Sequence, residues 1–413
     1  MKNSIAKKAL WLAAIGNFLE IYNYVLFAVM LPIISPIFFP AESYGLSMFL
    51  GYLSFAITFF VAPLGSIFWG WIGDIKGRHI LLQNSILLMA IPSLMIASLP
   101  TFKEIGILAP ILLLLLRIIQ GLSASGGISG SKIFAMEHMG SERLGVSSGV
   151  ISAAGAMGVC FAWVVGLYIV ASPENGLNWR IAFFIGASLY FVALLLKKYS
   201  KDLKLVNPQN QSNPKVYEVG NVLAENKYQS FTVFLIGGLM GMLSYTMHAF
   251  ITPFVIGLGV ESQSAYKFSI IAIIVTACSA VYSGMLVDRK KLNTTNYLLN
   301  HIKIVGVAFP IFWFFIITKK MEFILLGYLG LGYLLGVFAS VSGVVMYKLF
   351  PPHVRCRGTM LNNSLGIALF GGLTPMTFAL ITKIFPFAPA IVISVYALAL
   401  IFLSKRLMLK LAR

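Results

Sequence analysis

The stretch GWIGDIKGR, residues 70–78, decides the fold, because it is a short charged turn between two long apolar runs. The runs cover residues 46–70 and 79–99. Each holds the roughly 20 mostly apolar residues that a helix needs to cross a bilayer. Gly77 suits a tight turn between two helices, since glycine tolerates positive φ. The stretch therefore predicts two membrane-spanning helices joined by a polar turn.

A related turn occurs in the second half of the chain. The stretch SGMLVDRKK, residues 283–291, places Asp288 214 residues after Asp74. Arg357 also lies 214 residues after Arg143, and each arginine is near a glycine. Two coincidences at one offset predict that a six-helix unit has been duplicated. Parallel halves around a site at the membrane midplane are a design of transporters.

Further apolar runs extend this pattern over the whole chain. We expect twelve membrane helices, at residues 9–35, 46–70, 79–99, 105–136, 145–171, 179–197, 230–257, 266–288, 299–318, 322–349, 356–383 and 385–404. The stretch 198–229 is polar and contains several Asn and Pro residues, so it cannot lie in lipid. It separates an N-terminal six-helix half, 1–197, from a C-terminal half, 230–413. The expected fold class is an all-α membrane protein with two pseudo-symmetric halves of six helices.

The composition agrees with a chain embedded in lipid. Of 413 residues, 59% are hydrophobic and 11% are charged, with a mean hydropathy of +0.88. Soluble domains carry about 25% charged residues. The net charge of +18 does not indicate nucleic acid, because the basic residues stand in short clusters between apolar runs. The three cysteines have no metal-ligand spacing, and no P-loop or catalytic triad is recognisable, so we expect no enzyme, cofactor or metal site.

The basic residues also predict the orientation in the membrane. The two termini, the central loop and the turns after the second, fourth, eighth and tenth helices, counted with the helix ends that adjoin them, hold 24 of the 31 Lys and Arg residues. The opposite set of loops holds six, and Arg117 lies inside a helix. Positive residues accumulate on the cytoplasmic side. We therefore expect both termini in the cytoplasm, with the protein in a bacterial inner membrane.

At these turns the sequence resembles the major facilitator superfamily, whose signature between the second and third helices is similar to residues 70–78. More stretches resemble one branch, the metabolite:proton symporters, which include proline/betaine, α-ketoglutarate, citrate and shikimate carriers. These stretches are GNFLEIYNY (16–24), RIIQGLSASGG (117–127), the turn from Glu137 to Gly145, NWRIAFF (178–184) and LFPPHVRCRGTMLNNSLGIALFGGLTP (349–375). The resemblance covers nearly the whole chain in order, and it implies the fold and transport function of that superfamily.

The chain departs from the pattern of that branch at two positions. The branch usually has an aspartate in its first-helix motif, where this chain has Asn23. It usually has a glutamate after the paired glycines of the fourth helix, where this chain has Ile128. Each change removes an acid from the region that handles protons or solute in the branch. The coupling ion and the solute therefore remain open.

Two charged residues stand near the middle of expected helices, namely Glu20 and Arg117. At 1.5 Å per residue, both lie roughly 16–18 Å deep. A charge at that depth costs a few kcal/mol or more, so it normally faces a cavity or a partner. One interpretation is an ion pair that holds the first and fourth helices together; the other is a solute or proton site. The candidate solute and proton residues are Glu20, Tyr22, Asn23, Tyr24, Arg117 and Gln120.

Other residues are candidates for a gate at the cytoplasmic side. The resemblance implies that the turn at 70–78 fastens the two halves together there, whereas the plain alternative is a basic turn that only sets topology. The candidate gate residues are Gly73, Asp74, Gly77, Arg78, Glu137, Arg143, Asp288, Arg289, Arg355 and Arg357. Asp74 can interact with helix N-termini, and Arg78 with carboxylates or lipid phosphates.

Aromatic residues and one histidine have two interpretations each. Phe18, Tyr22 and Tyr24 lie on the first helix, where an aromatic ring can hold a quaternary ammonium through cation–π attraction. They can equally be ordinary membrane-helix aromatics. His248, in the seventh helix, can relay protons or simply pack with a hydrogen bond.

These observations predict a secondary active transporter that moves a small organic acid or zwitterion into the cell by alternating access. The expected partners are that solute, protons as the coupling ion and the lipid bilayer, with the protein a monomer. One alternative is proton-driven efflux of amphipathic compounds, against which the central Arg117 argues. Another is a membrane sensor that does not transport, for which a long soluble domain would be expected.

Overall fold

The computed structural model describes residues 2–171, 179–199 and 219–412, which consist of helices joined by short connections and contain no strand. Eleven helices in this part of the chain are long and apolar enough to cross a membrane. A twelfth, Ala388–Ser404, is apolar but shorter. The twelve expected spans are therefore confirmed, and the chain is a multi-pass membrane protein.

The N-terminal half contains six spans, and the last of them is interrupted at Ser188. Its helices are α1 (Lys2–Phe38), α2 (Tyr44–Ile75), α3 (Arg78–Ser98), the short α4 (Phe102–Ile105), α5 (Leu108–Met139), α6 (Leu144–Ala171), α7 (Trp179–Ala187) and α8 (Leu189–Lys198). A single 3₁₀ turn, η1, covers Ser141–Arg143.

The C-terminal half contains two spans that change to π-helix in their middle. Its helices are α9 (Val219–Glu225), α10 (Lys227–Tyr245), the π-helix η4 (Thr246–Phe250), α11 (Ile251–Gly257), α12 (Ser262–Arg289), α13 (Thr294–Ile317), α14 (Met321–Leu349), the 3₁₀ turn η5 (Pro352–Val354), α15 (Arg355–Gly366), the π-helix η6 (Ile367–Gly371), α16 (Thr374–Ile384) and α17 (Ala388–Ala412). π-Helical turns inside α-helices are frequent at functional sites.

The segment expected as a loop over 198–229 is partly helical. Residues 200–218 lie outside the described residues, but α9 already begins at Val219. Val222 explains this start, because its side chain is buried in the hydrophobic core of the C-terminal half. Several helices also extend beyond their expected ends, and α5 reaches Met139.

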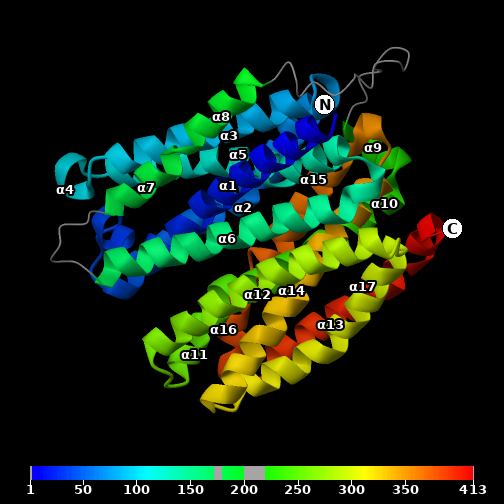
Figure 1. Ribbon diagram of the computed structural model, residues 1–413. Helices are drawn as coiled ribbons and strands as arrows, with labels where there is room; N and C mark the ends of the chain where they lie inside the picture. Colours follow the sequence, from blue (N-terminus) through cyan, green and yellow to red (C-terminus); the bar gives the residue numbers. More distant parts are fainter. Residues whose placement is uncertain (1, 172–178, 200–218, 413) are drawn as a thin grey trace.

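The two halves lie side by side, and Figure 1 shows α1–α8 in one bundle and α10–α17 in the other. The two chain ends lie at the same end of the molecule, opposite α4 and α11 (Figure 1). We call this the terminal end. Large apolar side chains such as Ile384 and Phe402 remain exposed on the outside of the bundles, as a surface in contact with lipid requires.

The halves meet along two principal helix pairs, α6 with α12 and α2 with α15. The first pair crosses at Gly145 and Gly284. A Cβ added to either glycine would overlap the carbonyl oxygen of the other. Small residues of this kind let the backbones of membrane helices approach closely. The crossing brings together segments of the two halves that are distant in the sequence.

Candidate functional site

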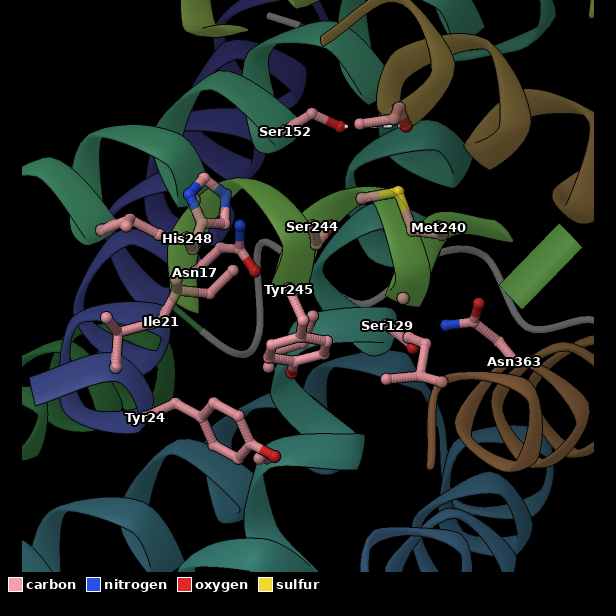
Figure 2. A pocket seen from close by; sticks show the side chains of 18 of the residues that line it. Asn17, Ile21, Tyr24, Ser129, Ser152, Met240, Ser244, Tyr245, His248 and Asn363 are labelled. Carbon is pink, nitrogen blue, oxygen red and sulfur yellow. Dashed lines mark hydrogen bonds between the residues drawn. The ribbon is translucent and has the colours of Figure 1, made fainter. Parts of the chain in front are cut away.

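A cavity of about 210 Å³ lies between the two halves, and Figure 2 shows side chains that line it. The N-terminal half contributes Asn17, Ile21, Tyr24, Val25, Phe59, Ala62, Ala124, Ser125, Ile128, Ser129, Lys132, Ser152, Gly155, Ala156 and Val159. The C-terminal half contributes Met240, Gly241, Ser244, Tyr245, His248, Thr276, Leu335, Ala339, Asn363, Ser364, Ile367 and Ala368.

The π-helices form part of the lining. His248 belongs to η4, and Ile367 and Ala368 belong to η6. A π-helical turn adds a residue to the turn and changes which side chains face one side of the helix. His248 lies four residues after Ser244, so the two share one face of the helix, and both line the cavity together with Tyr245 (Figure 2).

Several polar groups of the lining have spare hydrogen-bonding capacity. Asn17 donates from Nδ2 to the carbonyl oxygen of Ile151 at 2.8 Å, but its Oδ1 has no partner among the described residues. The Nδ1 atom of His248 and the Oδ1 atom of Asn363 also lack partners there. A buried polar group without a partner costs about 1–3 kcal/mol, so these atoms favour a ligand that supplies the missing bond.

One wall of the cavity is aromatic. The rings of Tyr24 and Phe59 meet edge to face at 5.4 Å between centroids, and Phe59 meets Tyr245 in the same way at 4.9 Å. All three residues line the cavity. The wall can contact an apolar solute or a cationic group, since the face of an aromatic ring attracts cations.

A lysine from the N-terminal half also reaches this cavity. The Nζ atom of Lys132 donates to the carbonyl oxygen of Ala339, on α14 in the other half, at 3.0 Å. Ser152 donates to the same carbonyl at 3.2 Å, a bond that Figure 2 also draws. Sequence reasoning missed Lys132 as a site residue. Its spacing from Ser125, Ile128 and Ser129 was the available signal, because these positions share one face of a helix.

Of the six candidate solute and proton residues, only Tyr24 lines this cavity. The other five lie buried within the N-terminal half. Tyr22 donates to the carbonyl oxygen of Ala182 at 2.8 Å, and Asn23 donates to that of Gly186 at 2.9 Å. These two bonds tie α1 to α7.

Arg117 and Gln120 belong to a hydrogen-bonded chain in the same half. Arg117 donates from Nη1 to Oε1 of Gln120 at 2.8 Å, and Gln120 donates to Ser93 at 3.0 Å. Ser93 in turn donates to Oδ1 of Asn23 at 2.8 Å. The guanidinium of Arg117 lies 4.1 Å from the ring centroid of Phe27. Its Nε and Nη2 atoms have no hydrogen-bond partner among the described residues.

Glu20 occupies a separate position on α1. Its side chain is fully buried, and neither carboxylate oxygen has a hydrogen-bond partner within the described chain. A Cβ added at Gly127 of α5 would overlap both oxygens, so the carboxyl group rests directly against that glycine.

The interpretation of Glu20 and Arg117 as an ion pair is wrong. None of the salt bridges between described residues joins them. Ten residues of α5 separate Arg117 from Gly127, which is about 15 Å along the helix axis. The expected depth of Arg117 assumed a helix over 105–136, whereas α5 runs from Leu108 to Met139 and places Arg117 nine residues, or about 14 Å, after its first residue.

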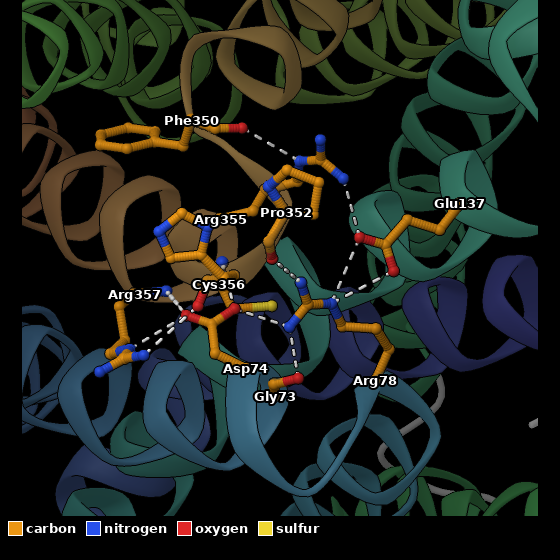
Figure 3. A network of polar contacts seen from close by, with 10 residues as sticks. Gly73, Asp74, Arg78, Glu137, Phe350, Pro352, Arg355, Cys356 and Arg357 are labelled. Atoms are coloured by element: carbon orange, nitrogen blue, oxygen red, sulfur yellow. Dashed lines mark hydrogen bonds and ion pairs between the residues drawn. The ribbon is translucent and has the colours of Figure 1, made fainter. Parts of the chain in front are cut away.

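Charged residues gather at the terminal end, where Figure 3 shows a network across the two halves. Asp74 accepts hydrogen bonds from the backbone N–H groups of Cys356 and Arg357, both at 3.0 Å. It also pairs with the Nε atom of Arg357 at 3.1 Å and with Arg78 at 2.6 Å. The expected contact between Asp74 and a helix N-terminus is present, because these N–H groups begin α15.

Arg78 and Glu137 complete this network (Figure 3). Arg78 pairs with Glu137 at 3.2 Å, and it donates to the carbonyl oxygens of Pro352 at 2.7 Å and of Gly73. Glu137 also pairs with Arg355 at 3.0 Å. Gly77 has φ = +109° directly before α3, as the tight turn requires. We call the set Asp74, Arg78, Glu137, Arg355 and Arg357 the Asp74 cluster.

The related position in the second half makes fewer contacts. Asp288 accepts hydrogen bonds from the backbone N–H groups of Gly145 at 2.9 Å and Val146 at 2.7 Å, at the start of α6. Arg143 and Arg289 are exposed, and no hydrogen bond or ion pair joins their side chains to other described residues. We call this pair of backbone contacts the Asp288 cap.

Two helical bundles that enclose a cavity and meet through related polar contacts define a membrane carrier of the alternating-access class. The family model described as Major Facilitator Superfamily matches residues 13–400, and the chain belongs to this family. It is a secondary active transporter rather than an enzyme, as the sequence predicts.

Curated relatives align with this chain over most of their length. A "Putative proline/betaine transporter" of Staphylococcus aureus (strain COL) is 27% identical over 400 residues, which cover 93% of this chain and 84% of that protein. The "Glycine betaine/proline/ectoine/pipecolic acid transporter OusA" of Dickeya dadantii (strain 3937) is 26% identical, covering 90% of this chain and 77% of the relative.

Solved structures share the fold. The proton:xylose symporter XylE superposes with a TM-score of 0.70 at 17% identity, covering 98% of this chain and 96% of that chain. The human organic anion transporter MFSD10 (TETRAN) gives a TM-score of 0.73 at 16% identity, covering 97% and 99%. At these identities, the comparison with the two solved structures establishes a shared fold.

Proposed function

We propose that this chain takes up a small zwitterion of the proline/betaine type, driven by protons, across a bacterial inner membrane. The observation that carries the proposal is the cavity between the halves, which combines an aromatic wall with unpaired polar atoms. The names of the curated relatives support this solute class. The excess of basic residues at the terminal end favours a cytoplasmic position for both termini.

Transport requires the halves, near 1–197 and 230–413, to rock as units of a monomer around the cavity. In the structure described, the Asp74 cluster and the Asp288 cap join the halves at the terminal end. We propose that these contacts form a gate that holds the carrier closed on the cytoplasmic side. Solute would then enter from the opposite side, and release inside would require both sets of contacts to separate.

Glu20 is the proposed proton site. An ionised carboxylate that is buried without a partner is costly, whereas its protonated form carries no net charge. Glu20 meets that description in the structure. Its place on α1, three residues from the cavity-lining Asn17 and one from Ile21, allows protonation to alter the shape of the cavity wall.

An uptake experiment in proteoliposomes tests the function. Vesicles with an alkaline interior should accumulate labelled glycine betaine or L-proline above equilibrium, and a protonophore should collapse that accumulation. Vesicles without protein are the control. Equilibration without accumulation would contradict proton coupling, and an absence of carrier-dependent flux for both solutes would contradict the proposed solute class. Acid-driven export of amphipathic dyes would instead support the efflux alternative.

A further inference from the structure

Lys132 is placed where a lysine is costly. It stands on α5, seven residues before the helix ends at Met139, or about 10 Å along the axis. Long basic side chains near a helix end normally extend toward the membrane surface. Lys132 instead lines the cavity, and its ammonium bonds to Ala339 in the opposite half. A buried position of this kind in a membrane protein points to a ligand or a functional partner.

The ammonium group of Lys132 has unused capacity. It carries three donors, and the carbonyl oxygen of Ala339 accepts one of them. That carbonyl is also shared with Ser152. The described salt bridges do not include Lys132, and the residues that line the cavity include no Asp or Glu. The cavity therefore has a cationic group without a protein counterion.

The remainder of the cavity fits the other end of a zwitterion. Tyr24, Phe59 and Tyr245 offer aromatic edges and faces to an ammonium or to apolar methylene groups. Asn17, His248 and Asn363 offer neutral polar atoms. A carboxylate is the natural complement of Lys132, because an ionic acceptor forms a stronger hydrogen bond with an ammonium than a neutral carbonyl does.

We propose that Lys132 binds the carboxylate of the solute and thereby restricts the carrier to solutes that have one. The carboxylate accepts from the donors of the ammonium that Ala339 leaves free. This inference rests on the proposed transport function, and it assigns the residue that determines the substrate class. The other reading of the Lys132–Ala339 bond is a structural tie that never meets solute.

Matched solutes test the inference. Choline has the quaternary ammonium of glycine betaine without the carboxylate, and L-prolinamide replaces the carboxylate of L-proline by a neutral amide. Wild-type protein should transport the two carboxylates with KM values lower than those of their analogues by about tenfold or more, as expected for a charge-assisted bond. Lys132→Met should raise KM for glycine betaine by a similar factor, and Lys132→Arg should restore part of the affinity.

Lys348→Met is the matched control. Lys348, at the end of α14, also donates one hydrogen bond to a neutral oxygen, Oγ1 of Thr294 at 2.9 Å, but it does not line the cavity. Its substitution should leave KM unchanged. A purely structural Lys132 would lower turnover for all four solutes equally and leave the KM ratios as in the wild type, which would overturn the inference.

Thermal stabilisation of the purified protein separates this inference from the proposed function. Stabilisation by glycine betaine or L-proline, lost in Lys132→Met and weak with choline or L-prolinamide, supports the inference even where no uptake occurs. In that case the proposed function alone fails. Equal stabilisation by glycine betaine and choline, or no stabilisation by either glycine betaine or L-proline, would overturn the role of Lys132. The uptake experiment would then test the proposed function independently.

Discussion

At the scale of single residues, Arg117 shows a buried charge that ion pairing among the described residues does not compensate. Arg117 is fully buried, yet two of its nitrogen atoms lack hydrogen bonds among the described residues. Its compensation comes from Gln120 and from the rings of Phe27 and Phe55, whose centroids lie 4.1 and 5.7 Å from the guanidinium. A desolvated cation–π contact is worth about 2 kcal/mol. The guanidinium therefore positions helices through flat contacts that a lysine cannot reproduce.

Arg117→Lys tests this positioning role. The ammonium of lysine keeps the charge but loses the planar group that stacks on Phe27 and reaches Gln120. We expect turnover to fall about tenfold while KM for the solute changes by less than about threefold, because the side chain does not line the cavity. Uptake kinetics at matched expression provide the measurement. A large rise in KM with normal turnover would instead indicate direct solute binding by Arg117.

At the scale of helices, the close contact between α1 and α5 requires a glycine at position 127. The carboxyl group of Glu20 occupies the space where Gly127 would carry a Cβ. Gly127→Ala should displace Glu20 or separate the two helices, since the backbone of a packed helix cannot move away freely. We expect proton-driven accumulation to fall about tenfold, in line with the steep dependence of activity on position.

The control for this substitution is Gly257→Ala, at the end of α11. A Cβ at Gly257 would meet nothing within 4 Å, and its φ is not positive. Uptake and thermal stability should stay as in the wild type. Equal losses in both alanine variants would show that helix glycines are generally sensitive, and the specific role of Gly127 would be rejected.

The two contact sets at the terminal end differ in strength, although the duplicated turns predict similar ones. Asp74 binds two backbone N–H groups and two arginines, whereas Asp288 binds the backbone N–H groups of Gly145 and Val146 and forms no salt bridge with another described residue. Hydrogen bonds to charged groups contribute about 1.5–3 kcal/mol each. The α2–α15 contact is therefore held more strongly at this end than the α6–α12 contact.

Substitution of each aspartate by asparagine compares the two sets. Asp74→Asn should reduce turnover strongly and leave KM for the solute within about threefold, because no residue of the cluster lines the cavity and the proposed gate acts on exchange between states. Asp288→Asn should reduce turnover less. Initial rates over a range of solute concentrations give both constants. A loss of affinity with unchanged maximal rate in Asp74→Asn would contradict the gate.

At the scale of the whole molecule, the sequence predicts the spans better than the site. Each span follows from hydropathy summed over consecutive residues, which is a local property, and the Asp74 turn follows from its charged motif. The π-helices η4 and η6 were not expected, because a single added residue in a helical turn leaves the hydropathy unchanged. The split of the sixth span at Ser188 was missed for the same reason.

The cavity could not be predicted because it depends on pairs of residues that are distant in the chain. Lys132 and Ala339 are 207 residues apart, and Ser152 and Ala339 are 187 apart. Such contacts depend on how the two halves dock. The sequence singles out Glu20 and Arg117 because they are charged residues within apolar helices. A charge in an apolar helix shows that burial is costly, but it does not identify the residues that contact it. The motif on the first helix predicts Tyr24 as a site residue, and Tyr24 does line the cavity.

Energy coupling is a property of the whole carrier, because a proton on one residue must change which side of the membrane the cavity faces. Glu20 is suited to this role, since it is fully buried and unpaired among the described residues, and it rests against α5 while its own helix lines the cavity. With its proton, the group is neutral and compatible with the close contact at Gly127. Without it, the buried charge is costly unless water or a cation reaches it, and we propose that a rearrangement of the halves provides this.

Glu20→Gln should mimic the protonated group permanently, because an amide is neutral and close in size to a carboxylic acid. We expect uphill accumulation driven by a pH gradient to be abolished, whereas exchange of labelled for unlabelled solute between loaded vesicles and medium continues. Exchange needs only the return of the loaded carrier, which does not require the proton to leave. Glu42→Gln, at an exposed glutamate between α1 and α2, is the matched control and should accumulate solute normally. If Glu20→Gln still concentrates solute in response to the gradient, another residue carries the coupled proton, and His248 becomes the next side chain to substitute because it titrates and lines the cavity.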